Sequence, residues 1–209
     1  MSSAGQQAGV SSWEGGGSPF SINSKKLGMW LFIISDALTF TGVLMAYSYV
    51  RVASEEWPTP FHMWPSIVVS SIMTFCLLTS SITMVMAVTA AKQGRVQAAA
   101  RWIHFTMLGG VAFLLLHANE WRELIHEGLR PFENPWGTPM FGATFFSLTG
   151  LHMLHVTIGV VLLGIIAAGF KRGRYTADHV EISGLYWHFV DLVWMFIFPL
   201  VYLLSVSME

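Results

Sequence analysis

The sequence predicts an all-α membrane protein, a bundle of five transmembrane helices in one domain. Of its 209 residues, 54% are hydrophobic and 11% are charged, whereas a soluble domain carries about 25% charged residues. The mean hydropathy is +0.56, and five apolar runs each exceed the ~20 residues that a helix needs to cross a bilayer. A transmembrane β-barrel is disfavoured, because its strands would appear as short alternating segments.

The chain divides into a polar start and a helical remainder. Residues 1–24 are rich in Gly, Ser, Ala and Gln and lack the basic start and apolar core of a signal peptide, so we expect a flexible tail. Residues 25–209 are expected to form the transmembrane domain. The five spans are predicted at about residues 27–50, 64–91, 102–125, 140–170 and 182–206. Short connections between them make neighbouring helices antiparallel.

Basic residues are divided unevenly between the two ends of the predicted bundle. Eight lie at the end where the first helix starts: Lys25, Lys26, Lys92, Arg95, Arg101, Lys171, Arg172 and Arg174. Three lie at the other end: Arg51, Arg122 and Arg130. Because cytoplasmic loops carry the excess of positive charge, we expect a cytoplasmic N-terminus and a periplasmic C-terminus.

The two predicted outer loops combine acids, prolines and tryptophans, in the segments Glu55–Pro60 and Arg130–Gly137. Trp57, Trp64 and Trp136 fall in or beside these loops. An indole suits the headgroup region because one edge is apolar and the other carries a hydrogen-bond donor. We therefore interpret these tryptophans as interface anchors.

Ionisable residues occur inside four of the five apolar runs: Asp36; His117 and Glu120; His152 and His155; His188 and Asp191. An ionisable side chain at the bilayer centre costs roughly 2.5–3.5 kcal/mol on insertion scales, so it normally faces other helices or water. The paired residues are spaced i, i+3 and therefore lie on one helix face. At ~1.5 Å per residue, Asp36 and Asp191 lie roughly 14 Å from the cytoplasmic ends, with His155 slightly deeper.

These residues admit three interpretations. Histidines and carboxylates on facing helices can hold a di-iron centre or haem, but a di-iron site requires Glu-x-x-His on two helices. They can line a transport path, although the runs show neither broken helices nor an internal repeat. They can also form interhelical hydrogen bonds worth about 0.6 kcal/mol each, which fix the packing. The physical argument alone favours the third interpretation.

Four motifs resemble subunit III of haem-copper respiratory oxidases, in its short five-helix bacterial form. Residues Tyr186–Trp194 read Tyr-Trp-His-Phe-Val-Asp-Leu-Val-Trp and resemble the signature of that family. Residues Leu31–Gly42 are similar to its first shared helix, and Asn119–Trp121 contain a glutamate that resembles one near the outer end of a later helix. Residues Phe145–Gly159 contain the pattern Thr-Gly-x-His-x-x-His-Val. The motifs occur in family order over nearly everything after Lys25.

The resemblance implies an accessory subunit of an oxygen-reducing, proton-pumping complex in a bacterial plasma membrane, most simply a cytochrome c oxidase. It implies no catalytic residue, redox centre or metal ligand in this chain, with haems and copper in partner subunits I and II. The implied partners are subunit I by direct contact, subunit II in the same complex, membrane phospholipids and a respiratory supercomplex. No nucleic-acid partner is expected. The implied roles are support of proton uptake and of stability during turnover.

The resemblance also bears on individual residues. Asp36 corresponds to a carboxylate that reacts with hydrophobic carbodiimides, and is therefore the candidate for proton uptake. The other polar residues are then an interhelical network: Glu120, His152, His155, His188 and Asp191. Two departures from the family pattern concern Asp36, where glutamate is common, and His117, where glutamine or glutamate is more usual. Longer members of the family also have two additional helices before the first one.

Two alternatives stay open at the level of the sequence. The first is subunit III of a quinol oxidase, or the related subunit of a nitric oxide reductase, because this chain contacts neither electron donor. The second, from another class, is a freestanding haem or di-iron membrane enzyme built on the same histidines and carboxylates.

Overall fold

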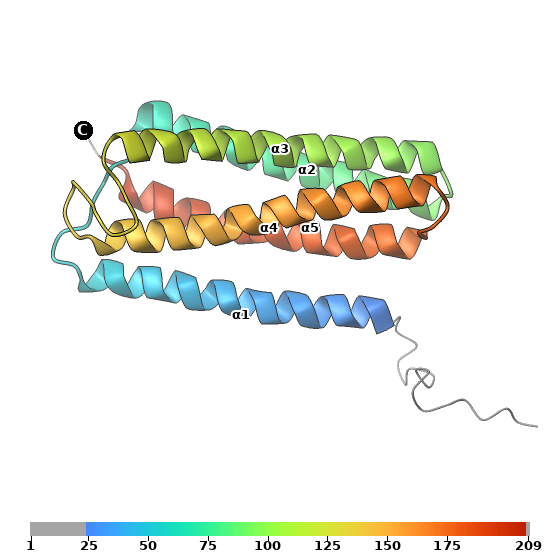
Figure 1. Ribbon diagram of the computed structural model, residues 1–209, viewed down its shortest axis with the longest axis horizontal. Helices are drawn as coiled ribbons and strands as arrows, with labels where there is room; N and C mark the ends of the chain where they lie inside the picture. Colours follow the sequence, from blue (N-terminus) through green and yellow to red (C-terminus); the bar gives the residue numbers. More distant parts are fainter. Residues whose placement is uncertain (1–23, 208–209) are drawn as a thin grey trace, which may run out of the picture.

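The computed structural model describes residues 24–207, and helices account for most of them (Figure 1). Five helical segments of 29 to 32 residues are long and apolar enough to cross a membrane, which confirms the predicted fold class. The elements, in chain order, are α1 (Ser24–Ala53), the π-helical turn η1 (Met63–Ile67), α2 (Val68–Lys92), α3 (Val96–His126), α4 (Met140–Lys171), α5 (Ala177–Ile197), the π-helical turn η2 (Phe198–Tyr202) and the 3₁₀ turn η3 (Leu203–Ser205). The predicted tail lies outside the described residues, except for Ser24.

The helix ends differ from the predicted spans where polar residues belong to a helix or where proline interrupts one. Helix α5 begins at Ala177, before the apolar run, and the Thr176 backbone N–H there donates to His179 Nδ1 at 3.3 Å. At its other end, the apolar run continues but the α-helix stops at Ile197. Pro199 supplies no N–H for the regular ladder, and the chain widens into η2.

Four helices form a closed ring, and the fifth lies outside it. Helix α2 packs on α3, α3 on α4, α4 on α5, and α5 back on α2. Helix α1 makes its substantial contacts with α4 and α5 alone, along one side of the bundle (Figure 1). Its buried side chains are accordingly few: Ile33, Phe40 and Tyr47.

The centre of the ring is filled by Trp187 of α5. A Cβ added at Gly110 of α3 would lie 2.5 Å from this indole, and one added at Gly159 of α4 would lie 3.0 Å from it. The indole N–H donates to Ser80 Oγ of α2 at 3.0 Å. One side chain therefore contacts the other three helices of the ring, and glycine provides the space on two of them.

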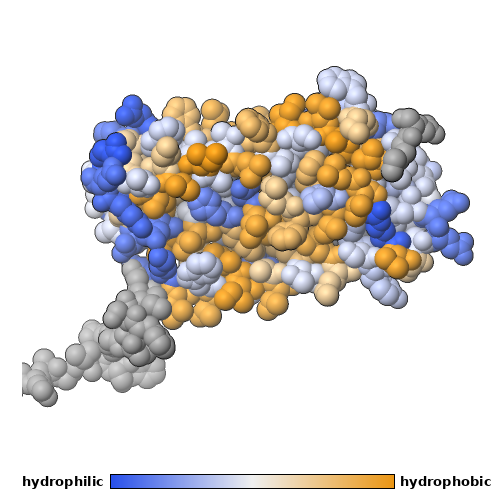
Figure 2. Space-filling model, turned by 180° about the vertical axis from the view of Figure 1, so that it is seen from behind, coloured by the Kyte–Doolittle hydropathy of each residue, from blue (hydrophilic) through white to orange (hydrophobic). Residues whose placement is uncertain are grey.

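The surface has an apolar band between two polar ends (Figure 2). At the end where α1 starts, the Glu181 carboxylate accepts from Lys26 Nζ at 2.7 Å and lies 2.9 Å from Lys92 Nζ. The opposite end carries the 54–62 and 127–139 connections, and is called the loop end below. There the Phe61 N–H donates to the Ser205 carbonyl, which joins the first connection to the end of the fifth span.

Candidate functional site

Three clusters of polar side chains lie between the helices. The first joins α1 to α4, where His155 Nε2 lies 3.1 Å from Asp36 Oδ1. His155 Nδ1 also lies 2.8 Å from the Leu151 carbonyl, one turn back on its own helix. The contact between Asp36 and His155 agrees with the similar depths that the sequence predicts for them.

The second cluster joins α2 to α5 through a serine. Ser81 Oγ donates to Asp191 Oδ2 at 2.6 Å, and His188 Nδ1 lies 3.2 Å from the same Oγ. The i, i+3 spacing thus places His188 and Asp191 on one face, as expected, but the residue that they share is a hydroxyl. Asp191 bonds to Ser81 and not to the pair formed by Asp36 and His155, so the three residues predicted at similar depths belong to two separate clusters.

The third cluster surrounds Glu120 of α3, which is 6% exposed. Ser70 Oγ donates to Glu120 Oε1 at 3.1 Å, and the Tyr202 hydroxyl donates to Oε2 at 2.8 Å. His117 Nδ1 lies 3.4 Å from the same Oε2. Two helical segments besides α3 therefore converge on one carboxylate: α2 through Ser70, and η2 through Tyr202.

His152 differs from the prediction that it forms an interhelical hydrogen bond. It is fully buried, and neither ring nitrogen has a hydrogen-bond partner among residues 24–207. Its ring instead stacks on Trp194 with centroids 5.2 Å apart, and meets Phe113 edge-on at 5.5 Å. In the part of the chain that the structure describes, no three His, Cys, Asp or Glu side chains form a group that could hold a metal ion.

Sequence reasoning missed the hydroxyl partners and gave His117 little weight. Ser70, Ser81 and Tyr202 carry no sequence signal, because hydroxyl groups are common in transmembrane helices and usually bond to their own backbone. The available signal for His117 was its position one turn before Glu120 in an apolar run.

The three predicted interface anchors have different surroundings. Trp64 is 74% exposed, as a side chain in contact with lipid headgroups would be. The Trp57 indole is partly buried, meets the Tyr47 ring edge-on and donates to Ser205 Oγ at 3.2 Å. Trp136 lines a cavity between the two connections at the loop end.

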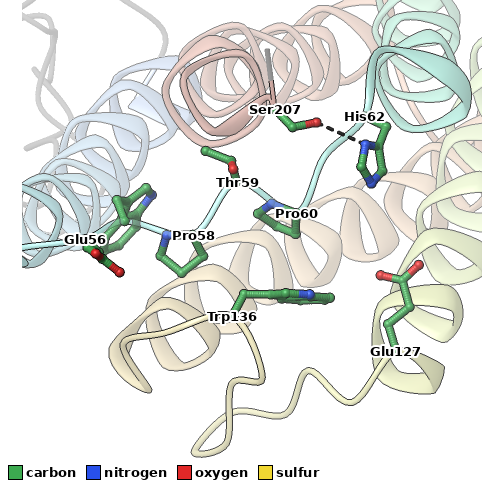
Figure 3. A pocket seen from close by; sticks show the side chains of 9 residues that line it. Glu56, Pro58, Thr59, Pro60, His62, Glu127, Trp136 and Ser207 are labelled. Carbon is green, nitrogen blue, oxygen red and sulfur yellow. Dashed lines mark hydrogen bonds between the residues drawn. The ribbon is translucent and has the colours of Figure 1, made fainter. Parts of the chain in front are cut away.

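This cavity has a volume of about 590 Å³. Figure 3 shows the Trp136 indole between the prolines of the first connection and the Glu127 carboxylate at the end of α3. The His62 ring on the far side lies 3.0 Å from Ser207 Oγ. A smaller cavity of about 160 Å³ shares three lining residues with it, Pro60, His62 and Glu127, and is also lined by Glu120.

Comparison with known proteins agrees with the motifs. The family described as Cytochrome c oxidase subunit III matches residues 9–206. The chain is 32% identical over 187 residues to cytochrome c oxidase subunit 3 of Alkalihalophilus pseudofirmus, covering 88% of each chain. It is 35% identical over 184 residues to quinol oxidase subunit 3 of Bacillus spizizenii, covering 87% of each. It is 33% identical over 186 residues to cytochrome c oxidase subunit 3 of Sus scrofa, covering 85% of this chain and 68% of the pig protein.

The five-helix membrane fold, the four motifs in order and these similarities all point to one family. The chain is a multi-pass membrane protein and belongs to the cytochrome c oxidase subunit III family, the third subunits of haem-copper oxidases.

Proposed function

We propose that this chain is a non-catalytic subunit of an oxygen-reducing, proton-translocating oxidase in a bacterial plasma membrane. It packs directly on subunit I, in a complex that also contains subunit II. The haems and copper belong to those partners. The chain holds phospholipid against the complex and supports proton uptake and durability during turnover.

One observation carries the accessory role: the carboxylates within the spans bond to side chains on other helices of the chain itself. Asp36 contacts His155, Asp191 accepts from Ser81, and Glu120 accepts from Ser70 and Tyr202. Such bonds hold helices in register and contribute about 0.6 kcal/mol each. Groups engaged in this way support a packing function better than a redox one.

We propose cytochrome c as the electron donor of the complex, with quinol as the alternative. The relatives carry both names at similar identities, 32% for the Alkalihalophilus cytochrome c oxidase subunit and 35% for the Bacillus quinol oxidase subunit. The test is co-purification in mild detergent, followed by turnover with reduced cytochrome c and with a quinol. A two-copper motif in the co-purifying subunit II would support cytochrome c.

Asp36 is the residue that we propose for proton uptake. It lies on the half of α1 nearer the basic end, its side chain is 12% exposed, and its second oxygen, Oδ2, has no hydrogen-bond partner among residues 24–207. A carboxyl group at a protein–lipid boundary can exchange a proton with a neighbouring subunit. This assignment is separable from the packing role, because asparagine at position 36 retains a hydrogen-bonding side chain and removes the ionisable one.

Removal of the chain from the complex tests the accessory role. We expect the haem and copper spectra to remain intact and initial oxygen reduction to continue, because no redox ligand leaves with the chain. Proton delivery should fall, most of all at alkaline pH where protons are scarce. Activity should also decay sooner over many turnovers.

The measurement is a depleted complex assayed for its visible spectrum, its initial rate against pH, and its activity over time. Re-addition of the purified chain is the control and should restore the lifetime. Immediate loss of a haem or copper signal would contradict the accessory role and favour a ligand role for the histidines.

A further inference from the structure

Two histidines in the bundle core retain unpaired ring nitrogens. His117 and His152 are each 0% exposed, and none of their four ring nitrogens has a hydrogen-bond partner among residues 24–207. A buried polar group without a partner costs about 1–3 kcal/mol. In native proteins, such groups are generally satisfied by ordered water when the protein itself offers no partner.

The two histidines are neighbours. Both rings contact Trp194, with centroid distances of 5.5 Å for His117 and 5.2 Å for His152. Both also contact Phe113, each at 5.5 Å. Through these shared contacts, the two imidazoles lie in the same part of the core. A water molecule bound to one imidazole would therefore lie near the other.

His117 leads to the loop end through Glu120. Its Nδ1 lies 3.4 Å from Glu120 Oε2, and Glu120 lines the cavity of about 160 Å³. Glu123 and Glu127 line the same cavity further along α3. Since water occupies ~30 Å³ per molecule in the liquid, the space accommodates several waters between the buried carboxylate and the surface.

The smaller cavity adjoins the larger one of about 590 Å³, which contains the His62 ring (Figure 3). Protonatable side chains thus follow one another from the loop end to the core: Glu127, Glu123, Glu120, His117 and His152. The order is given by the helix register, because Glu123, Glu120 and His117 lie along one face of α3 and Glu127 directly follows the helix.

We propose that Glu120, His117 and His152 form a buried, hydrated proton-exchanging chain that is reached from the loop end of the bundle through these two cavities. These three side chains would bind water molecules and exchange protons with them. The titratable groups that face these side chains are Tyr202 on Glu120, Glu123 at the mouth, and His155 beyond His152. Phe40 packs edge-on against His152 and His155, with centroids 6.5 and 5.1 Å away, and marks the inner limit of the chain.

The proton exchange proposed for Glu120, His117 and His152 is distinct from the proton uptake proposed for Asp36, which concerns the opposite half of the bundle. It depends on the geometry of the bundle alone, whatever the electron donor of the complex and whatever the role of Asp36.

Exchange of the imidazole C2 hydrogen for deuterium tests the proposal. The full-length chain in lipid nanodiscs is incubated in D₂O, and each histidine is followed by mass spectrometry of its peptide. We expect His117 and His152 to exchange measurably despite their burial, because water reaches them. Absence of exchange at both residues would overturn the proposal.

Blocking the cavity tests the route. Ser66 lines the smaller cavity, whereas Ser71 lies on an exposed part of α2 and does not line it. Ser66→Phe should slow exchange at His117 and His152 several-fold, and Ser71→Phe should leave both rates unchanged. Asn119→Phe, at another lining position, should reproduce the effect of Ser66→Phe.

Another histidine reports on folding in the same experiment. His188 contacts Ser81 between α2 and α5 and does not line the blocked cavity, so an unchanged exchange rate there shows that a variant retains the packing of these helices. If His117 and His152 exchange at wild-type rates in both blocked variants while the fold is intact, water arrives by another path and the proposal fails.

Discussion

At the scale of single residues, one tight constraint is the fit of Trp187 between the glycines of α3 and α4. Its indole leaves no room for a methyl group at Gly110, where an added Cβ would also lie 2.8 Å from Val160. Gly42 on α1 has no atom of another residue within 4 Å of the same added Cβ. Gly110 therefore provides space for Trp187, whereas Gly42 provides space for no neighbouring side chain.

Gly110→Ala should destabilise the chain by about 1–3 kcal/mol, the usual cost of overpacking a filled core. Gly42→Ala is the matched control and should be neutral or slightly stabilising, because alanine favours the helix by up to ~1 kcal/mol over glycine. Thermal unfolding in detergent compares them. Equal unfolding temperatures for the two variants would show that Trp187 can move aside.

The sequence predicts which ionisable residues share a helix face, but not which residues of other helices they contact. The i, i+3 spacing correctly places His188 with Asp191, and His117 with Glu120, on common helix faces. It cannot identify Ser81 as the shared partner, because partner choice depends on the rotation of α2 about its own axis. That rotation follows from the packing of the whole ring.

At the scale of elements, α1 is the helix with the fewest attachments. In its most apolar stretch of 18 residues, 17% of the residues are buried, against 50% in the corresponding stretch of the last span. Within the membrane, its contact with α4 includes one ionisable pair, Asp36 with His155, packed beside the Phe40 ring. A helix held in this way is sensitive to the loss of one polar contact.

Asp36→Leu should weaken the attachment of α1 by about 0.6 kcal/mol, and by up to ~1.7 kcal/mol if no other group replaces the bond. Asp36→Asn should retain most of the stability, because the amide oxygen still accepts a hydrogen bond. Thr39→Val, at an exposed position on the same helix, is the control. The rate of limited proteolysis in the connection between α1 and α2 measures how firmly α1 is held. Equal cleavage rates for all three variants would contradict a contribution of Asp36 to this packing.

A hydrophobic carbodiimide should modify Asp36 before Asp191. Such reagents enter from the lipid phase and need a protonated acid in an apolar setting. Asp36 lies on the outlying helix, whereas Asp191 is 7% exposed and accepts a short hydrogen bond from Ser81. Peptide mass spectrometry locates the adduct, and preferential labelling of Asp191 would reverse the order of accessibility.

The number and order of the helices follow from hydropathy, but their ends do not. The apolar run at the end of the fifth span continues beyond Ile197, while the regular helix does not. Hydropathy predicts which residues lie in the bilayer. Pro199 alters the backbone hydrogen bonds but leaves the segment apolar, so hydropathy does not detect the end of the α-helix. The start of α5 shows the converse, because Asp178 and His179 are polar yet helical.

At the scale of the whole molecule, the two ends of the bundle differ in charge. The basic residues at the end where α1 starts outnumber those at the loop end by eight to three. The sequence could predict this division because it depends only on the number and order of the spans. The three polar clusters could not be predicted in the same way, since each joins helices that are distant along the chain.

Fusion of a topology reporter tests the orientation. A reporter before Met1 should be exposed on the cytoplasmic side and one after Glu209 on the periplasmic side, because positive charge is retained in the cytoplasm. An odd number of spans requires opposite sides. Both reporters on the same side would contradict the five-helix membrane topology, and exchanged sides would contradict the orientation alone.

The attachment of α1 has a consequence for biosynthesis. At the end where α1 starts, Lys26 pairs with Glu181 of α5, and at the loop end Arg51 donates to the Leu204 carbonyl of η3 at 2.6 Å. During synthesis α1 is made before α4, α5 and η3, the elements that carry its partners. Asp36 therefore cannot contact His155 until α4 has been made. A nascent chain that stalls before α4 is complete would expose this acid to the quality-control machinery of the membrane.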